Sequence, residues 1–287
     1  MIKKINALCR SFIWKGSPEI SRKSPVAWKT VCRPNPQGGL NVINVAVWNQ
    51  VCMLKCLWNL CRKTDNLWVK WIHSYYIKDG NIMDMAINTN WSWVMKNIMQ
   101  SIIFTTQLSA AWSDYLQQGK FHMGKMYRQL INDGTRVIWR NLIIKNAARP
   151  RSILNLWQAC HGKLPTKERL RRFGFIQEDI YSFCLEHVET IEHIFFQCRN
   201  TCRIWKEILN WMEVQHTPLA WKEEIDWVVT QTKRKGWKGA LLKLGFTEIL
   251  YGIWCHRNSI TFNTLVTKKI ERKLLRILYI GDGIEKN

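Results

Sequence analysis

Apolar residues recur at helical spacing along most of the chain, and this periodicity predicts a mainly α-helical fold. In the first part of the sequence the pattern predicts helices over residues 2–14, 42–60, 67–77 and 91–103. In the rest it predicts helices over residues 125–132, 137–145, 150–160, 166–173 and 237–262, followed by a basic helix near 268–278. Pro165 before Thr166, with Glu168 in the first turn, is typical of a helix start, and Gly174 of a helix end.

Two stretches depart from the helical pattern. Residues 24–32 alternate as a strand does, and a Pro- and Gly-rich turn follows, so a short β excursion is expected near 24–43. Residues 181–202 are rich in Cys and His and indicate a small zinc-knuckle-like insertion. The sequence therefore divides into three expected segments, which are a helical region at 1–121, a second domain at 122–206 and a helical tail at 207–287.

The charge of the chain is strongly unbalanced. It has 43 Lys and Arg residues against 21 Asp and Glu residues, a formal net charge of +22. Such an excess favours a polyanionic partner, and RNA or DNA is the usual one. Basic residues crowd one short predicted helix and its approach, which makes five side chains candidate phosphate contacts: Lys163, Lys167, Arg169, Arg171 and Arg172. A solvated surface without a ligand is the alternative for this group.

Cysteine usage favours a reducing compartment, either nuclear or cytoplasmic. The ten cysteines are irregularly spaced and no secretory pattern precedes them. No apolar run approaches the roughly 18 residues that span a bilayer, so no membrane partner is expected. Cys52 and Cys61 would lie on opposite sides of one helix, which favours small buried hydrophobes over a second metal cluster with Cys56. Most of the 17 tryptophans sit in apolar runs and are expected in the core.

The stretch from residue 184 to 198 holds the residue types that zinc prefers. Cys184, His187, His193 and Cys198 could supply the four thiolate and imidazole ligands of a tetrahedral site. On an α-helix, however, residues five apart differ by about 140° in azimuth, so His193 and Cys198 converge only if the helix ends by Cys198. From spacing alone, a zinc site and a chance grouping stay equally open.

The middle of the sequence resembles the zinc-binding domain of plant LINE (non-LTR) retroelement reverse transcriptases. The resemblance rests on Asn-Ala-Ala-Arg-Pro at 146–150, Trp-Gln-Ala-Cys-His-Gly-Lys-Leu-Pro-Thr at 157–166, and Glu-Thr-Ile-Glu-His-Ile-Phe-Phe-Gln-Cys at 189–198. The flanks agree, because Trp-Lys-Thr-Val-Cys-Arg-Pro at 28–34 with Gly38-Gly39-Leu40 resembles the segment that follows the polymerase fingers and palm, and residues 250–258 resemble the family's C-terminal helix. By the same resemblance, the helical region at 1–121 corresponds to the segment that follows the reverse-transcriptase thumb.

The resemblance carries a ligand pattern that this sequence matches in three of four positions. The family has Cys-x2-Cys, eight residues, His, four residues and Cys, which implies Cys184, His193 and Cys198 as ligands. Tyr181 stands at the first Cys position and is a poor zinc ligand. His187 is the candidate replacement and Cys202 a weaker one, so zinc is expected to be held weakly or to be lost. A decayed site is the open alternative.

The sequence also indicates that the chain is not an enzyme by itself. The aromatic-x-Asp-Asp signature of reverse transcriptases is absent and no two aspartates are adjacent, although polymerases need closely placed aspartates for two metal ions. We therefore expect a non-catalytic C-terminal fragment that binds RNA or DNA without sequence preference. Two alternatives stay open, which are a protein-interaction module built on the Trp-rich helices and a retroelement relic without selected function.

Overall fold

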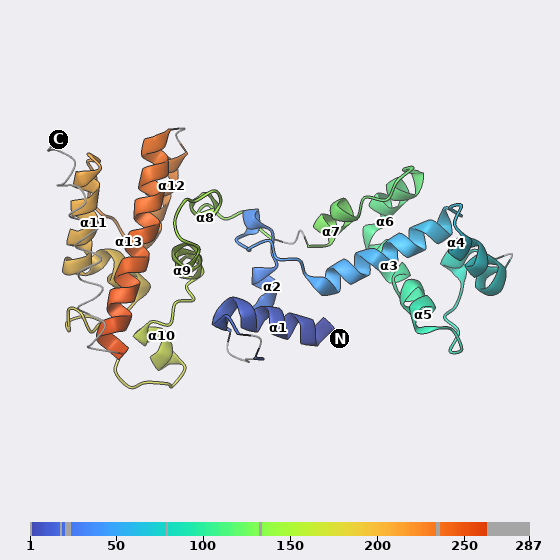
Figure 1. The fold of residues 1–287 in the computed structure, drawn as a ribbon, viewed down its shortest axis with the longest axis horizontal. Coiled ribbons are helices and arrows are strands. Elements are labelled where there is room, and N and C mark those ends of the chain that lie inside the picture. The colour runs from blue at the N-terminus through green and yellow to red at the C-terminus, as the bar shows by residue number, and fades with distance from the viewer. Residues whose placement is uncertain are drawn as a thin grey trace. The chain divides into compact units, whose positions relative to one another are not determined.

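A computed structural model describes residues 2–17, 19–20, 24–78, 80–131, 134–233 and 236–262. These residues are mostly helical, and their one β-type pairing is an isolated antiparallel bridge between Ile180 and Val188. The mainly α fold expected from the sequence is confirmed. The chain forms two compact units: unit 1 comprises residues 1–22, 28–34 and 39–135, and unit 2 comprises residues 23–27, 35–38 and 136–287 (Figure 1).

Unit 1 is built around one long helix. Its elements are α1 (Ile2–Lys15), α2 (Trp28–Val31), α3 (Val45–Cys61), α4 (Leu67–Ile72), the π-helix η2 (His73–Ile77), the 3-10 turn η3 (Ile82–Asp84), α5 (Trp93–Gln100), α6 (Ile102–Gln117) and α7 (Met123–Ile131). Helix α3 begins at the cap residue Asn44, whose side chain accepts from the backbone N–H of Ala46 at 3.1 Å. It packs against α5, α6 and α7, so Leu54 and Leu57 are completely buried.

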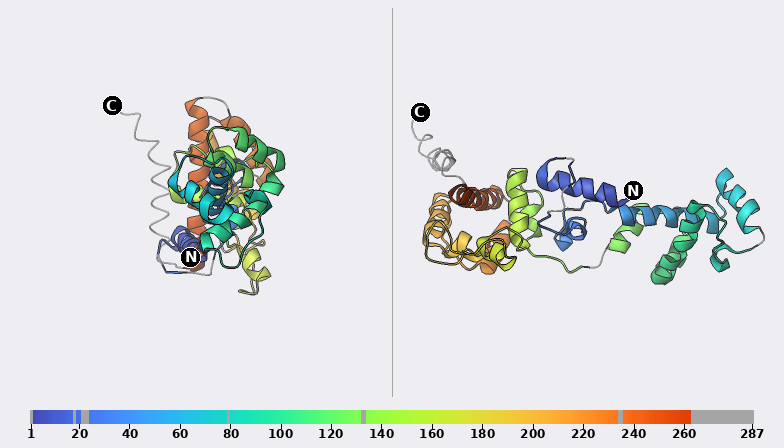
Figure 2. Two further views of the ribbon diagram at one scale, coloured as in Figure 1. Left: turned by 90° about the vertical axis from the view of Figure 1, so that its right-hand side faces the viewer. Right: turned by 90° about the horizontal axis from the view of Figure 1, so that it is seen from below.

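Unit 2 is assembled on its last helix. Its elements are the 3-10 turn η1 (Asn35–Gln37), α8 (Arg140–Ile143), α9 (Pro150–Cys160), α10 (Lys167–Arg172), the π-helix η4 (His193–Gln197), α11 (Arg199–Trp211), α12 (Trp221–Thr232) and α13 (Trp237–Phe262). Helix α13 packs against α9, α11, α12 and η4, and Figures 1 and 2 show it among these helices. Trp157, Trp205 and Phe246 are fully buried there.

The strand expected near residues 24–43 does not form. The described part of that stretch contains α2 and η1, and residues 39–44 then run without regular secondary structure. Proline at positions 25, 34 and 36 removes backbone donors that a ladder needs, and the described residues provide no partner strand. The basic helix expected near 268–278 lies outside the described residues.

The compact units and the three segments expected from the sequence divide the chain differently. Helix α7, at the start of the expected second segment, packs on α3 in unit 1. Helices α12 and α13 of the expected tail pack in unit 2, and α13 packs along α9 of the second segment. The tail thus completes the core of the middle segment.

Gly38 and Gly39 occupy positions that a side chain would disturb. Gly38 has φ 79°, and its carbonyl oxygen accepts from Trp157 Nε1 at 2.7 Å and lies 2.7 Å from His161 Nε2. A Cβ on Gly39 would lie 1.8 Å from the backbone oxygen of Arg33. The two glycines therefore allow a tight backbone turn. The Gly38 carbonyl contacts Trp157 and His161, which both lie in the segment 157–166 that resembles the family.

Candidate metal centre

A tight hairpin positions the first two candidate ligands. Tyr181 N–H donates to the His187 carbonyl at 2.8 Å, and the bridge between Ile180 and Val188 lies directly beside this bond. Leu185 N–H donates back to the Tyr181 carbonyl at 2.8 Å, with Leu185 at φ 59°. The chain therefore folds back within a few residues, as the expected zinc-knuckle-like insertion requires, and brings Cys184 and His187 to one side.

The second pair of candidate ligands lies on a π-helix rather than an α-helix. In η4 the Cys198 N–H donates to the His193 carbonyl at 2.9 Å, an i→i+5 bond. Such bonding brings residues five apart into line along the helix, which removes the 140° divergence that α-helical geometry would impose. Cys198 itself leaves the helix with extended backbone angles. His193 and Cys198 can thus face the same side.

Three of the four predicted ligands meet. Cys184 Sγ lies 3.2 Å from His193 Nε2, and one ligand atom each of Cys184, His187 and His193 lies within 4.8 Å of the others. The rings of His187 and His193 stack with centroids 5.0 Å apart. Ligand atoms in a tetrahedral zinc site are separated by about 3.3–3.8 Å, so small side-chain adjustments would suffice. The donor set fits zinc in type and in placement.

Cys198, the fourth predicted ligand, lies next to this group in the protein interior. It is buried, and its thiol interacts with the thiol of Cys184. Burial, followed by the neighbouring Cys184, raises the pKa of the Cys198 thiol, while bonds from the backbone N–H groups of Thr201 and Asn200 oppose that rise. Burial, followed by His187, lowers the pKa of His193, which favours the neutral imidazole that binds metals. Cys202 lies further along α11 and is not part of the group.

Tyr181 fills the position that the family pattern gives to a cysteine. Its side chain is completely buried, and its ring meets the His193 ring edge-on with centroids 5.7 Å apart. Its hydroxyl has no hydrogen-bond partner among the described residues. Burial in particular raises the pKa of this phenol well above its usual value, so it stays neutral. The position contributes a ring to the packing in place of a thiolate.

A buried ion pair that the sequence did not single out supports the hairpin. Glu189, at the end of the hairpin, pairs with Arg257 of α13, and both side chains are almost completely buried. The same carboxylate oxygen accepts from the backbone N–H of Lys167 at 2.7 Å, at the start of α10. Arg257 also lies over the ring of Trp254 at 4.9 Å. Both charged residues lie in segments that resemble the family. The sequence signal for this ion pair was Arg257 itself, a single arginine in an otherwise largely apolar stretch of a predicted helix.

The five candidate phosphate contacts have different surroundings. Lys163 is exposed in the loop before α10. Arg171 pairs with Asp179 at 2.6 Å and Arg172 with Glu168 at 2.7 Å, and both arginine side chains stay more than half exposed. The Arg169 guanidinium lies 5.7 Å from the ring of Phe173 and 3.5 Å from the carbonyl of Pro25. Lys167 Nζ donates to the Ile180 carbonyl at 2.8 Å and to Ser182 Oγ at 2.7 Å, so it holds the hairpin.

Other sequence expectations about cysteines and tryptophans are confirmed. Cys56 and Cys61 pack against the core of unit 1, and burial raises the pKa of Cys61 to about 11. Within the described ranges, the grouping of potential metal ligands is the one at Cys184, His187 and His193. Four of the 17 tryptophans are strongly exposed, namely Trp71, Trp93, Trp211 and Trp237.

Comparison with known proteins finds one family that matches the segment carrying this centre. Residues 121–205 match the family described as zinc-binding in reverse transcriptase, a stretch that contains all four candidate ligands. The middle of the chain is thus similar to a reverse-transcriptase zinc-binding region. This region extends from α7 to α11, so it includes residues of both compact units. The resemblance expected from the sequence is confirmed.

A curated relative supports the same assignment. The chain is 28% identical over 76 residues to a putative ribonuclease H protein of Arabidopsis thaliana. The similarity covers 26% of this chain and 12% of the relative, so the chain matches about an eighth of that protein's length. No solved structure matches. None of the described helices is both long enough and apolar enough to cross a membrane.

Proposed function

We propose that this chain is a non-catalytic, nucleic-acid-binding C-terminal part of a non-LTR retrotransposon reverse transcriptase that acts in the nucleus or cytoplasm. The observation that carries the proposal is the zinc-binding reverse-transcriptase match over residues 121–205 within a chain of net charge +22. The sequence lacks the adjacent aspartates of the polymerase signature, which supports binding without catalysis. The partner is RNA or DNA, held through its phosphates without sequence preference.

The basic surface beside the hairpin is the proposed grip. Lys163, Arg171 and Arg172 are exposed, and Arg169 is partly exposed beside them. The ion pairs of Arg171 and Arg172 are solvent-exposed on the arginine side, and such pairs contribute at most about 1 kcal/mol. A phosphate can therefore displace the carboxylate partners. Lys167 is assigned to this surface by its position, but its ammonium contacts favour a role in holding the hairpin.

A salt titration tests the grip. Replacing Lys163, Arg169, Arg171 and Arg172 by alanine should weaken binding to all sequences alike and flatten the log–log salt slope by about 0.7 per lost contact on single strands. A matched variant that removes exposed basic residues of α11 and α12, namely Arg199, Arg203, Lys206 and Lys222, controls for net charge. Equal losses in both variants would contradict the assigned surface. No binding by the wild type at low salt would contradict the function itself.

We propose that zinc binds weakly at Cys184, His193 and Cys198, with His187 as the fourth ligand. The grouping of three donor side chains and the contact between the two thiols support this set. Bound zinc would supply a structural cross-link between the hairpin and η4. Because Tyr181 replaces one thiolate, the affinity should be well below that of an intact four-ligand site of the family.

Cobalt substitution and metal analysis test this ligand set. Cobalt bound to the wild type should give thiolate charge-transfer and tetrahedral d–d absorption, and both should be lost in Cys198→Ser and weakened in His187→Ala. Cys202→Ser is the matched control and should keep the wild-type spectrum. One-to-one zinc that survives His187→Ala with unchanged affinity would show that the fourth ligand is another group.

The second candidate function is a protein-interaction module. The observation that favours it is the exposure of Trp211 at 64% and Trp237 at 70%, since large exposed aromatics are common in protein interfaces. A protein complex held by these rings would persist at high salt, whereas phosphate contacts would not.

A further inference from the structure

Unit 1 carries a cluster of aromatic rings on its surface. Trp71 of α4 is 51% exposed and Tyr75 of η2 is 65% exposed. Their rings are nearly parallel, with an interplanar angle of 9° and centroids 5.7 Å apart, because residues four apart are neighbours on a helix surface. Tyr76 meets both rings edge-on and also meets Trp91 edge-on at 5.9 Å. We call Trp71, Tyr75, Tyr76 and Trp91 the aromatic platform.

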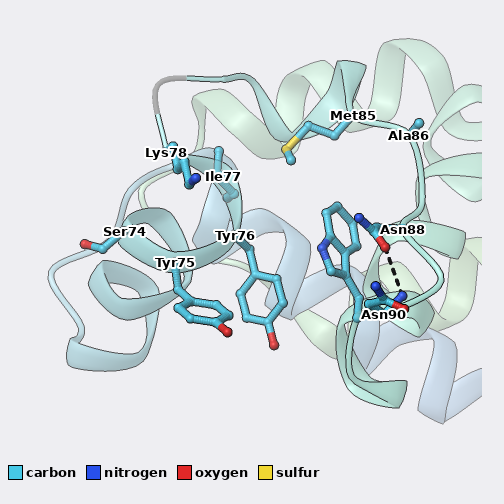
Figure 3. Close-up of a pocket in the computed structure, with 10 residues that line it drawn as sticks. Ser74, Tyr75, Tyr76, Ile77, Lys78, Met85, Ala86, Asn88 and Asn90 are labelled. Carbon is cyan, nitrogen blue, oxygen red and sulfur yellow. Dashed lines mark hydrogen bonds between the residues drawn. The ribbon is translucent and has the colours of Figure 1, made fainter.

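Three of the four platform residues line an open groove, and Trp71 stacks on Tyr75 outside that lining. The groove has a volume of about 940 Å³ and is lined by Tyr75, Tyr76 and Trp91 together with polar residues. Figure 3 shows Tyr75 and Tyr76 side by side on one wall, with Asn88 and Asn90 across from them. The Asn90 N–H donates to Asn88 Oδ1 at 2.9 Å, which orders the loop that carries the amides. The space suits one or two planar groups with polar edges.

The charge around the platform selects the kind of occupant. Residues 55–91, which carry all four rings, contain five basic and three acidic residues. Lys78 lines the groove itself, and Lys70, which precedes Trp71, is 68% exposed in an exposed ion pair with Asp65. Exposed rings, amide groups and surrounding positive charge together match unpaired bases on a phosphate backbone. An apolar peptide would offer no polar partner to Lys78 and the asparagine side chains that line the groove.

We propose that the aromatic platform binds unpaired bases of single-stranded RNA or DNA, as a second contact surface separate from the basic surface at α10. This proposal rests on the proposed nucleic-acid-binding function and specifies how bases, rather than phosphates, are held. Bases stack on Trp71 and Tyr75, and the polar loop of Asn88 and Asn90 lies beside their edges. Because every base has a π-face, stacking of this kind tolerates any sequence.

An abasic control separates base contacts from phosphate contacts. The probes are a single-stranded oligonucleotide and an oligonucleotide of equal length and charge that lacks bases, both titrated against the full chain by fluorescence anisotropy. The wild type should bind the base-bearing strand at least about fivefold more tightly, since one stacked base contributes roughly 1–3 kcal/mol. At moderate salt the phosphate contacts weaken, so base stacking should contribute a larger share of the binding free energy of the base-bearing strand.

Substitutions on the platform give the decisive comparison. Trp71→Ala with Tyr75→Ala should bring the affinity ratio between the two strands close to one, and Tyr75→Phe alone should retain it. Trp93→Ala is the matched control, because Trp93 is 69% exposed in the same unit but is neither a groove residue nor one of the stacked platform rings. Circular dichroism of each variant should match the wild type, since the substituted rings are exposed.

The outcomes separate this proposal from the wider function. An unchanged ratio in the double variant, or an equal fall in Trp93→Ala, would overturn the platform while leaving binding to both strands intact. If the wild type binds neither strand, the proposed function itself is contradicted. If the wild type forms a salt-resistant complex with another protein and only the double variant loses that complex, the platform belongs to a protein partner and the proposal is overturned.

Discussion

Unit 1 and unit 2 bury different kinds of polar side chain. In unit 1 the buried polar residues of the described chain are Ser11, Ser101 and Thr105, and each hydroxyl bonds a carbonyl three or four residues earlier in its own helix. In unit 2 the core closes over two carboxylates. Glu189 pairs with Arg257, and Glu224 accepts from Trp205 Nε1 at 2.7 Å and from Leu219 N–H at 2.8 Å.

The difference follows from what each unit has to hold in place. Unit 1 consists of helices that satisfy their own backbone, so apolar burial is sufficient to assemble them. Unit 2 must also fix an irregular hairpin that carries the candidate ligands and leaves Ile180, Leu185 and Val188 exposed. A carboxylate that bonds both α10 and α13 supplies directional contacts that apolar packing cannot supply. The two units should therefore respond differently to changes of charge, metal and pH.

The largest expected effect is at the buried ion pair. Arg257→Ala leaves the Glu189 carboxylate buried without its partner and should destabilise unit 2 by about 3–5 kcal/mol. Hydrogen exchange followed by mass spectrometry should show lost protection in α11 and α13 and unchanged protection in α3. The double variant Glu189→Leu with Arg257→Met should recover part of the loss, because no unpaired charge remains. Equal loss of protection in α3 would show that the units do not differ in this way.

Zinc should produce the next largest effect, again confined to unit 2. A ligand that binds only the folded state at 100 times its Kd stabilises that state by about 2.7 kcal/mol. Exchange protection in the hairpin and η4 should therefore rise with added zinc and fall with a chelator, while that of α3 and α5 stays constant. The same titration on Cys198→Ser should give no response. Zinc-dependent protection in unit 1 would contradict a metal centre restricted to residues 184–198.

The smallest expected effect is at the edge of unit 2. Burial tends to raise the pKa of Glu248, but hydrogen bonds from Arg149 outweigh it and lower the pKa below its usual value. The pair therefore contributes stability at neutral pH that is lost as the pH falls through the lowered pKa of Glu248. The Arg149 side chain is 61% exposed, so Glu248→Gln should cost at most about 1 kcal/mol at pH 7.

Urea unfolding at two pH values measures that effect. The wild type and Glu248→Gln should differ at about pH 7 and converge well below about pH 4, where an unperturbed glutamate is already protonated. Glu207→Gln is a suitable control, because Glu207 forms an exposed pair with Arg203 one turn away on α11. A difference for Glu248→Gln that persists unchanged in acid would assign its effect to packing rather than to charge.

Local pattern was sufficient for some elements and insufficient for others. The helices over 150–160 and 237–262 have the predicted limits. Their signals, a proline at the start of the first and a long apolar run in the second, lie within the helices themselves. Helices α11 and α12 were not among the predicted helices. The pairing of Glu189 with Arg257 joins residues 68 positions apart, which periodicity cannot detect. The π form of η4 likewise depends on packing around it.

The i→i+5 hydrogen bonding of η4 constrains the number of residues that this segment can contain. Four consecutive residues, His193 to Phe196, are all buried, so the turn presents a candidate ligand to the hairpin and aromatic rings to the core, and only Gln197 of η4 is exposed. Removing one residue would restore ordinary α-helical winding and rotate the rings by about 100° relative to the ligands. Substitutions of similar volume can be accommodated here, whereas a one-codon insertion or deletion would separate the metal centre from the core that supports it.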